Sequence, residues 1–357
     1  MRIAWVDNAR AIGILLVVVG HAPGLSPVAW RIIYSFHMPL FFFISGYLLQ
    51  TSGPMPSKWR FLKRVGQSLL LPYLFFGLLS YIYWLPTHTH GTLGRDYASL
   101  GPLDPLYGLA YGTIDRLYAN RVLWFFPCLF CTACLFFAVA RIRSLPVRWF
   151  ILVEAALLGL YLPTFLGAVR LPWNLDAALV ALLFYASGHF FRERGEAALA
   201  GRGERWMSWI LLPFAFAICV GVALSNAKVE MSIMAFGSPV LFLIAAYAGI
   251  LATTFISRAL PATGVARWLS HNTIIVFPLH PILFGMFTAL GVLAFGQPYS
   301  FKLNPVFCPL YVLGALACCV PLAYVFRRFA PWLTGRATGR HSEAAVSHGG
   351  TEGKDGR

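Results

Sequence analysis

The stretch Asp7-Asn8-Ala9-Arg10, followed by ten mostly apolar residues and then His21, decides the class of this chain. Eleven residues at about 100° each make roughly three helical turns plus about 20°, so Arg10 and His21 share one stripe about 16 Å apart along the axis. Ionisable residues in an apolar membrane helix are costly and usually face a cavity or a partner. The stretch therefore predicts a functional groove, with a positive charge for a phosphate at Arg10 and a proton-transfer group at His21.

The composition of the whole chain is that of a membrane protein. Of the 357 residues, 59% are hydrophobic and only 11% are charged, which is too apolar for a soluble globular protein. The net charge of +15 would suit a nucleic-acid-binding protein. The basic residues, however, sit in short segments between apolar runs, so we expect membrane lipids and not nucleic acid as surroundings.

Apolar runs of about 20 residues predict an all-α polytopic protein with ten transmembrane helices in one bundle. The predicted spans are Ala9–Gly24, Ile32–Leu49, Val65–Leu85, Val122–Ala140, Trp149–Pro163, Leu175–Phe191, Met207–Ser225, Phe236–Ile256, Leu269–Leu293 and Val306–Phe326.

The distribution of lysine and arginine orients these spans. With both termini in the cytoplasm, 21 of the 28 basic residues lie inside and 7 lie outside, as the positive-inside rule requires. The outer set is Arg31, Arg95, Arg116, Arg121, Arg170, Lys228 and Lys302. The longest outer loop, Pro86–Arg121, is long enough to form a lid or an acceptor surface.

Cysteine spacing imitates a metal site without supporting one. Cys128, Cys131 and Cys134 recur every three residues on a predicted helix. No polar residues accompany them, so small buried side chains explain them better than metal ligands do. We expect no metal and no prosthetic group.

Polar residues also interrupt the second span, which reads Ser35-Phe36-His37-Met38-Pro39-Leu40-Phe41-Phe42-Phe43-Ile44-Ser45-Gly46-Tyr47. Pro39 breaks the backbone ladder, which membrane helices tolerate where a neighbour or cavity satisfies the freed carbonyl. Gly46 permits close approach of another helix.

These two segments resemble the acyltransferase 3 family of integral-membrane acyltransferases. The pattern Arg-x10-His on the first span is followed by Phe-His-Met-Pro-Leu-Phe-Phe and Ser-Gly-Tyr on the second. The likeness is greatest to the branch of fucose 4-O-acetylase-like and exopolysaccharide acetyltransferases, and it extends over roughly residues 5–326. The further matching segments are Leu123-Trp124-Phe125-Phe126-Pro127, Asn174 and Asp176 with Phe184-Tyr185 and Gly188, and Trp268-Leu269-Ser270-His271-Asn272-Thr273 with His280.

The resemblance implies a membrane acyltransferase domain, which we place over residues 1–334. The remaining residues, 335–357, are rich in Gly, Ser, Ala and charged residues, which predicts a disordered cytoplasmic tail. The resemblance also implies acetyl-CoA as the donor substrate, supplied from the cytoplasm, and an essential first-span histidine. The implied acceptor is a sugar hydroxyl of an extracytoplasmic or lipid-linked glycan, such as a xanthan-type exopolysaccharide. The implied setting is a multi-pass protein of the bacterial inner membrane that can join a polysaccharide-synthesis complex.

Catalysis would then rest on His21 as general base, with Asp176 orienting its imidazole by the logic of a catalytic triad. His37 is either a supporting catalytic residue or a structural one. Asp176 also has a plain interpretation as an interfacial aspartate among lipid headgroups.

Donor and acceptor contacts are assigned to two further groups of residues. Arg10 would bind a CoA phosphate, helped by Lys58, Arg60, Lys63 and Arg64, although the positive-inside bias alone also explains those four. Trp124, Asn174 and His280 are assigned to substrate binding. Trp124 could equally be an interfacial anchor, and His280 lies mid-span, where it needs a polar partner.

Two other classes of protein fit parts of the pattern. A transporter of a small polar solute would also have about ten spans, with His and Arg for proton coupling. Transporters often repeat such features in both halves, whereas here the polar motifs concentrate in the first two spans. A passive subunit of a glycan-synthesis complex would leave Arg10 and His21 unexplained.

Overall fold

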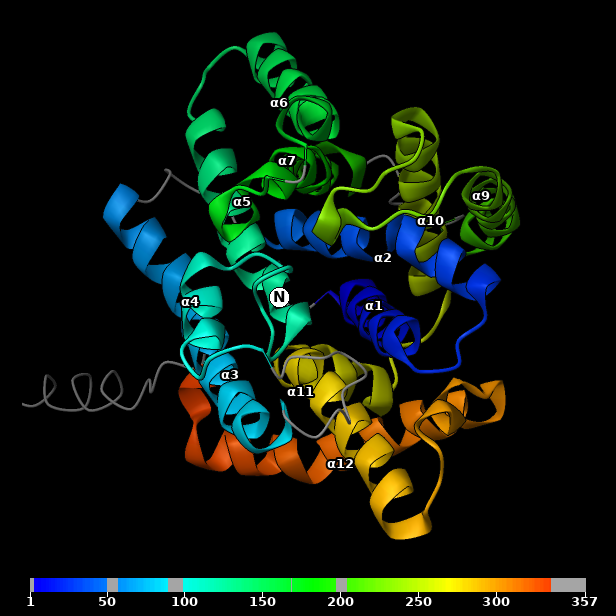
Figure 1. The fold of residues 1–357 in the computed structure, drawn as a ribbon. Coiled ribbons are helices and arrows are strands. Elements are labelled where there is room, and N and C mark those ends of the chain that lie inside the picture. Colours follow the sequence, from blue (N-terminus) through cyan, green and yellow to red (C-terminus); the bar gives the residue numbers. More distant parts are fainter. Residues whose placement is uncertain (1–2, 50–56, 89–98, 168, 197–203, 335–357) are drawn as a thin grey trace, which may run out of the picture.

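The computed structural model describes residues 3–49, 57–88, 99–167, 169–196 and 204–334. Within these ranges the protein is a helical bundle, and ten of its helical segments are long and apolar enough to cross a membrane (Figure 1). An isolated bridge between Glu230 and Ala235 is the one piece of extended pairing in the described residues. The predicted all-α membrane fold is confirmed. Helices suit this setting because they satisfy their own backbone polar groups in lipid.

The long helices are α1 Ala4–His21, α2 Pro27–Leu48, α3 Lys58–Thr87, α5 Phe125–Val139, α6 Leu145–Leu166, α7 Leu175–Phe190, α9 Glu204–Ser225, α10 Pro239–Ala259, α11 Gly264–Phe295 and α12 Cys308–Phe329. The shorter segments are α4 Asp104–Tyr111, η2 Arg121–Trp124, η3 Pro172–Asn174, η4 Phe191–Gly195, η5 Met231–Ile233, η6 Tyr299–Leu303, η7 Pro305–Phe307 and η8 Pro331–Thr334.

Two helix boundaries differ from the prediction in ways that matter for function. Helix α1 ends at His21, not at Gly24, since Pro23 follows and Gly24 adopts a left-handed φ of 78°. Helix α3 begins at Lys58, where Ser57 caps it by accepting a hydrogen bond from the Arg60 amide. The residues 58–64, expected in a loop, therefore form the first two turns of a helix.

Helix α1 lies in the middle of the bundle, packed against α2, α10 and α11 (Figure 1). Helices α6 and α9 lie at the periphery and expose large apolar side chains such as Phe150, Phe165, Phe214 and Phe216. A soluble protein rarely exposes such continuous apolar surface, whereas a lipid-facing helix requires it.

Helices α2 and α7 cross with their backbones in near contact. A Cβ atom built on Gly46 would overlap the carbonyl oxygen of Tyr185, and one built on Gly188 would overlap that of Phe43. Only glycine fits at such a crossing.

We expect Gly46→Ala to lower the unfolding free energy by about 1–3 kcal/mol or more, because the two backbones must move apart to admit the methyl group. Thermal unfolding of the detergent-solubilised protein measures this. Gly221→Ala on α9 is the matched control, since a Cβ there meets no atom within 4 Å. Equal melting temperatures for the two variants would contradict the close crossing.

Two expectations fall partly or wholly outside the described residues. The tail over 335–357 lies beyond them, as does segment 89–98 of the Pro86–Arg121 loop. The described part of that loop contains helix α4. The cytoplasmic location of both termini stays a prediction from the charge bias.

Candidate active site

Three histidines from three helices meet where α1 ends. The ring centroids of His21 and His280 lie 5.1 Å apart. Tyr34 links the third histidine to this pair, because its ring centroid is 4.7 Å from that of His37 and 5.8 Å from that of His21. Residues distant in sequence come together here because α1 packs between α2 and α11.

Each of the three imidazoles has a fixed orientation and tautomer. Each Nδ1 lies against the carbonyl oxygen one turn earlier in its own helix, and a carbonyl can only accept a hydrogen bond. The three distances are 2.8 Å for His21 to Val17, 2.8 Å for His37 to Ile33 and 3.3 Å for His280 to Val276. In the neutral ring the proton is then on Nδ1, and Nε2 keeps the lone pair that a general base needs.

Two cavities meet at His21. The first, which we call the histidine cavity, has a volume of about 220 Å³. Its lining is His21, Tyr34, His37, Met38, Ile114, Arg121, Val122, Trp124, Glu230, Met231, Ser232 and Phe277. The second, which we call the outer cavity, has a volume of about 340 Å³ and shares His21, Arg121 and Val122 with the first.

The other two histidines have more enclosed positions. His37 lines the histidine cavity and is 2% exposed. His280 is fully buried, and its Nε2 has no hydrogen-bond partner among the described residues. His21 is therefore the member of the cluster that both cavities reach.

The sequence analysis missed the connection between α9 and α10, which forms part of the cavity wall. Glu230 and Ser232 from this connection line the histidine cavity together with His21. The Glu230 carboxylate accepts a hydrogen bond of 3.1 Å from the Ser232 hydroxyl. Nothing in the local sequence of this connection points to the cavity, because only the packing of the helices brings it there.

The structure corrects the expected pairing of Asp176 with His21. The Asp176 carboxylate accepts hydrogen bonds from Arg170 Nε at 2.6 Å and Arg170 Nη2 at 3.1 Å. It also accepts from the backbone amides of Leu171 and Ala177. With its side chain only 3% exposed, Asp176 fixes the start of α7 and lines neither of the two cavities at His21.

The side-chain amide of Asn174 likewise hydrogen-bonds to other residues of the protein. Its amide nitrogen donates to the carbonyl oxygens of Gly112 and Trp124, and its oxygen accepts from Arg170. Asn174 is fully buried and lines neither cavity. It holds the backbone of Trp124, whose own side chain is 5% exposed and lines the histidine cavity.

The residues assigned to the donor lie toward the other end of α1. Arg10 is partly buried and lines neither cavity. On the same helix it lies about 16 Å from His21 along the axis. Lys58, Arg60, Lys63 and Arg64 are exposed on the first two turns of α3.

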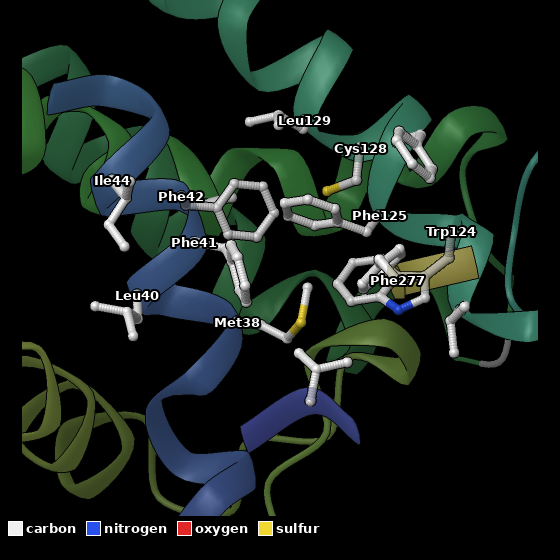
Figure 2. Close-up of a cluster of buried hydrophobic side chains, with 14 of the residues drawn as sticks. Met38, Leu40, Phe41, Phe42, Ile44, Trp124, Phe125, Cys128, Leu129 and Phe277 are labelled. Carbon is white, nitrogen blue, oxygen red and sulfur yellow. The ribbon is translucent and has the colours of Figure 1, made fainter. Parts of the chain in front are cut away.

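An aromatic layer lies beside the histidine cavity and contributes Phe277 to its lining. Figure 2 shows Phe41, Phe42, Phe125 and Phe277 packed together above Met38. The ring centroid of Phe125 lies 6.0, 5.2 and 5.5 Å from those of Phe41, Phe42 and Phe277. Phe41 also packs against Gly13, so this layer contacts α1 between Arg10 and His21.

A comparison of the sequence with protein families gives a match over most of the chain. A family model described as acyltransferase domain matches residues 3–324. The chain belongs to the acyltransferase 3 family. This membrane acyltransferase gave no match in the comparisons with curated proteins and with solved structures.

The described residues of this acyltransferase contain no group of three or more His, Cys, Asp or Glu side chains arranged to hold a metal ion. Cys128, Cys131 and Cys134 are free thiols on α5. The absence of a metal and of a prosthetic group stays a prediction.

Proposed function

We propose that this membrane acyltransferase transfers an acetyl group from cytoplasmic acetyl-CoA to a sugar hydroxyl of an extracytoplasmic or lipid-linked glycan. The main support is His21, which lines both cavities and whose Nδ1 is hydrogen-bonded to the carbonyl oxygen of Val17. A neutral imidazole held in this tautomer can take the proton of a hydroxyl near pH 7.

The reaction needs one proton shuttle. As the sugar oxygen attacks the thioester carbonyl carbon, its proton passes to His21 Nε2. The C–O bond forms, the tetrahedral intermediate collapses and the C–S bond breaks. The CoA sulfur then takes the proton back from Nε2, so the imidazole returns to its starting state. Holding hydroxyl and thioester against one another supplies much of the remaining rate enhancement.

On the donor side, the separation of Arg10 and His21 by about 16 Å suits the long arm of CoA between its phosphates and its thioester. Arg10 would bind a phosphate by charge-assisted hydrogen bonds. The exposed cations Lys58, Arg60, Lys63 and Arg64 would attract the nucleotide. The arm would pass beside the aromatic layer on its way to His21.

On the acceptor side, we propose a glycan approaching from outside. By family analogy, the fucose 4-O-acetylase-like branch and a xanthan-type exopolysaccharide suit this role, within the inner membrane of a bacterium. A polysaccharide-synthesis complex is a natural partner, since it would supply the acceptor. The transporter alternative has less support, because the matched family is one of acyltransferases.

Sealed vesicles of known orientation test this function. Right-side-out vesicles should acetylate external glycan only when labelled acetyl-CoA is enclosed within them, and inverted vesicles should require it outside. In right-side-out vesicles that contain the Arg10→Ala variant, the enclosed acetyl-CoA concentration needed for half-maximal rate should be higher than for the wild type. The reason is that the variant loses a charge-assisted contact with the donor. Equal labelling with acetyl-CoA on either side of right-side-out vesicles would contradict the proposed direction of transfer.

A further inference from the structure

The outer cavity has a chemical character that acetyl transfer alone does not require. Its lining combines two basic side chains, Arg121 and Lys302, with three tyrosines, Tyr83, Tyr118 and Tyr299. No aspartate or glutamate is among its described lining residues, whereas the histidine cavity contains a glutamate. The outer cavity is therefore a positively charged, aromatic site beside His21.

Lys302 is a partly buried cation in η6. Its Nζ lies 3.7 Å from the ring centroid of Tyr299 and donates a hydrogen bond to the hydroxyl of the same tyrosine. Within the described part of the chain Lys302 forms no ion pair. Burial lowers the pKa of Lys302, because the ammonium group has lost hydration. An anion bound beside it would offset that loss.

Asn120 is a buried polar residue of the lining. Its side chain is 4% exposed, and its amide nitrogen donates to Ser80 Oγ at 3.0 Å and to the Pro278 carbonyl at 2.8 Å. Its Oδ1 has no hydrogen-bond partner among the described residues. Its two donated hydrogen bonds fix this part of the cavity wall, which carries Arg121 as the next residue.

The size and the aromatic lining of the outer cavity suit a sugar ring. Its volume of about 340 Å³ falls at the lower end of small-ligand sites, which span about 300–1,000 Å³. Tyrosine rings offer apolar faces to the C–H groups of a sugar and polar hydroxyls at their edges. A charged sugar residue would thus find complements for its ring, its hydroxyls and its anionic group.

We propose that the outer cavity is the acceptor subsite for an anionic sugar residue, whose carboxylate or phosphate binds Lys302 and Arg121. A hydroxyl of the same or the adjacent residue then faces His21, which lines this cavity. This inference rests on the proposed function and adds to it the charge of the acceptor.

Three small acceptors test the proposal on the purified full-length protein. Two of them are charged: a glucuronate-terminated disaccharide and a disaccharide of uncharged sugars with a terminal phosphate. The third is the carboxyl-reduced, neutral counterpart of the first. Equilibrium binding is measured without acetyl-CoA, and acetylation is then measured with it. We expect at least one charged probe to bind more tightly than the neutral probe, and the better one shows whether the anion is a carboxylate or a phosphate.

The variant Lys302→Gln should lower the ratio of charged-probe to neutral-probe affinity by about 10–100-fold, as expected for loss of a charged hydrogen-bond partner. Lys302→Arg should keep most of this preference. Lys228→Gln is the matched control, because Lys228 is an exposed lysine of the predicted outer set that does not line the outer cavity. It should leave the ratio at the wild-type value.

The outcomes separate this inference from the proposed function. Equal binding of charged and neutral probes to the wild-type protein would overturn the anionic subsite, and so would an equal loss for all probes in Lys302→Gln. Charge-dependent binding without acetylation of any acceptor would instead leave the subsite standing and contradict the acetyl transfer.

Discussion

Replacement of His21 by alanine should reduce acetyl transfer by about 10²–10⁴-fold, the usual contribution of a general base. The fold should survive, because among the described residues the His21 imidazole hydrogen-bonds only to the carbonyl of Val17 on its own helix, and its side chain is partly exposed. The measurement is the initial rate of transfer from labelled acetyl-CoA, normalised to the amount of folded protein in the membrane.

His271→Ala is the matched control, since His271 is an exposed histidine of α11 that lines neither cavity. It should retain the wild-type rate. The variants His37→Ala and His280→Ala show whether the neighbours share the role. Retention of more than half the wild-type rate by His21→Ala, with a large loss in His37→Ala, would move the general base to His37.

Replacement of Asp176 by alanine should act on stability instead of chemistry. The Arg170–Asp176 pair is nearly buried, with side-chain exposures of 11% and 3%. Removing one partner of a buried ion pair lowers the unfolding free energy by about 3–5 kcal/mol, because the remaining charge stays buried without compensation. We therefore expect a strongly reduced melting temperature in detergent and a lower yield of folded protein, with a transfer rate per folded molecule close to that of the wild type.

A surface pair provides the control for this variant. Asp115 lies 3.8 Å from Arg116, and their side chains are 52% and 41% exposed. Asp115→Ala should therefore change the unfolding free energy by no more than about 1 kcal/mol. A stable but inactive Asp176→Ala protein would restore a catalytic role for Asp176 and refute the structural one.

The sequence was sufficient for the features that depend on local periodicity. Ten apolar runs predicted ten spans, because the thickness of a bilayer fixes the length of a helix that crosses it. The eleven-residue spacing placed Arg10 and His21 on one stripe, because the helical repeat is fixed. The motifs on the first two spans identified the family that the comparison with residues 3–324 confirms.

Helix ends were less predictable than helices. The basic segment from Lys58 to Arg64 resembles a cytoplasmic loop by charge, yet the Ser57 cap starts a helix there. Similarly, α1 stops at His21 because Pro23 and Gly24 follow, which places the imidazole at the end of the helix where two cavities meet. Capping and turn residues decide such boundaries, and a long apolar run conceals them.

By itself, then, the sequence determined the class of the protein, its spans and the stripe with His21, all of which follow from spacing within one helix. Only the tertiary structure decided that His280 lies beside His21, that Asp176 pairs with Arg170, and that Glu230 and Lys302 border the cavities. The physical reason is that lipid and protein interior are both apolar, so the composition of a membrane helix does not specify which neighbour each of its faces meets. That choice is made by close packing, such as the glycine crossing of α2 and α7, between residues far apart in the chain.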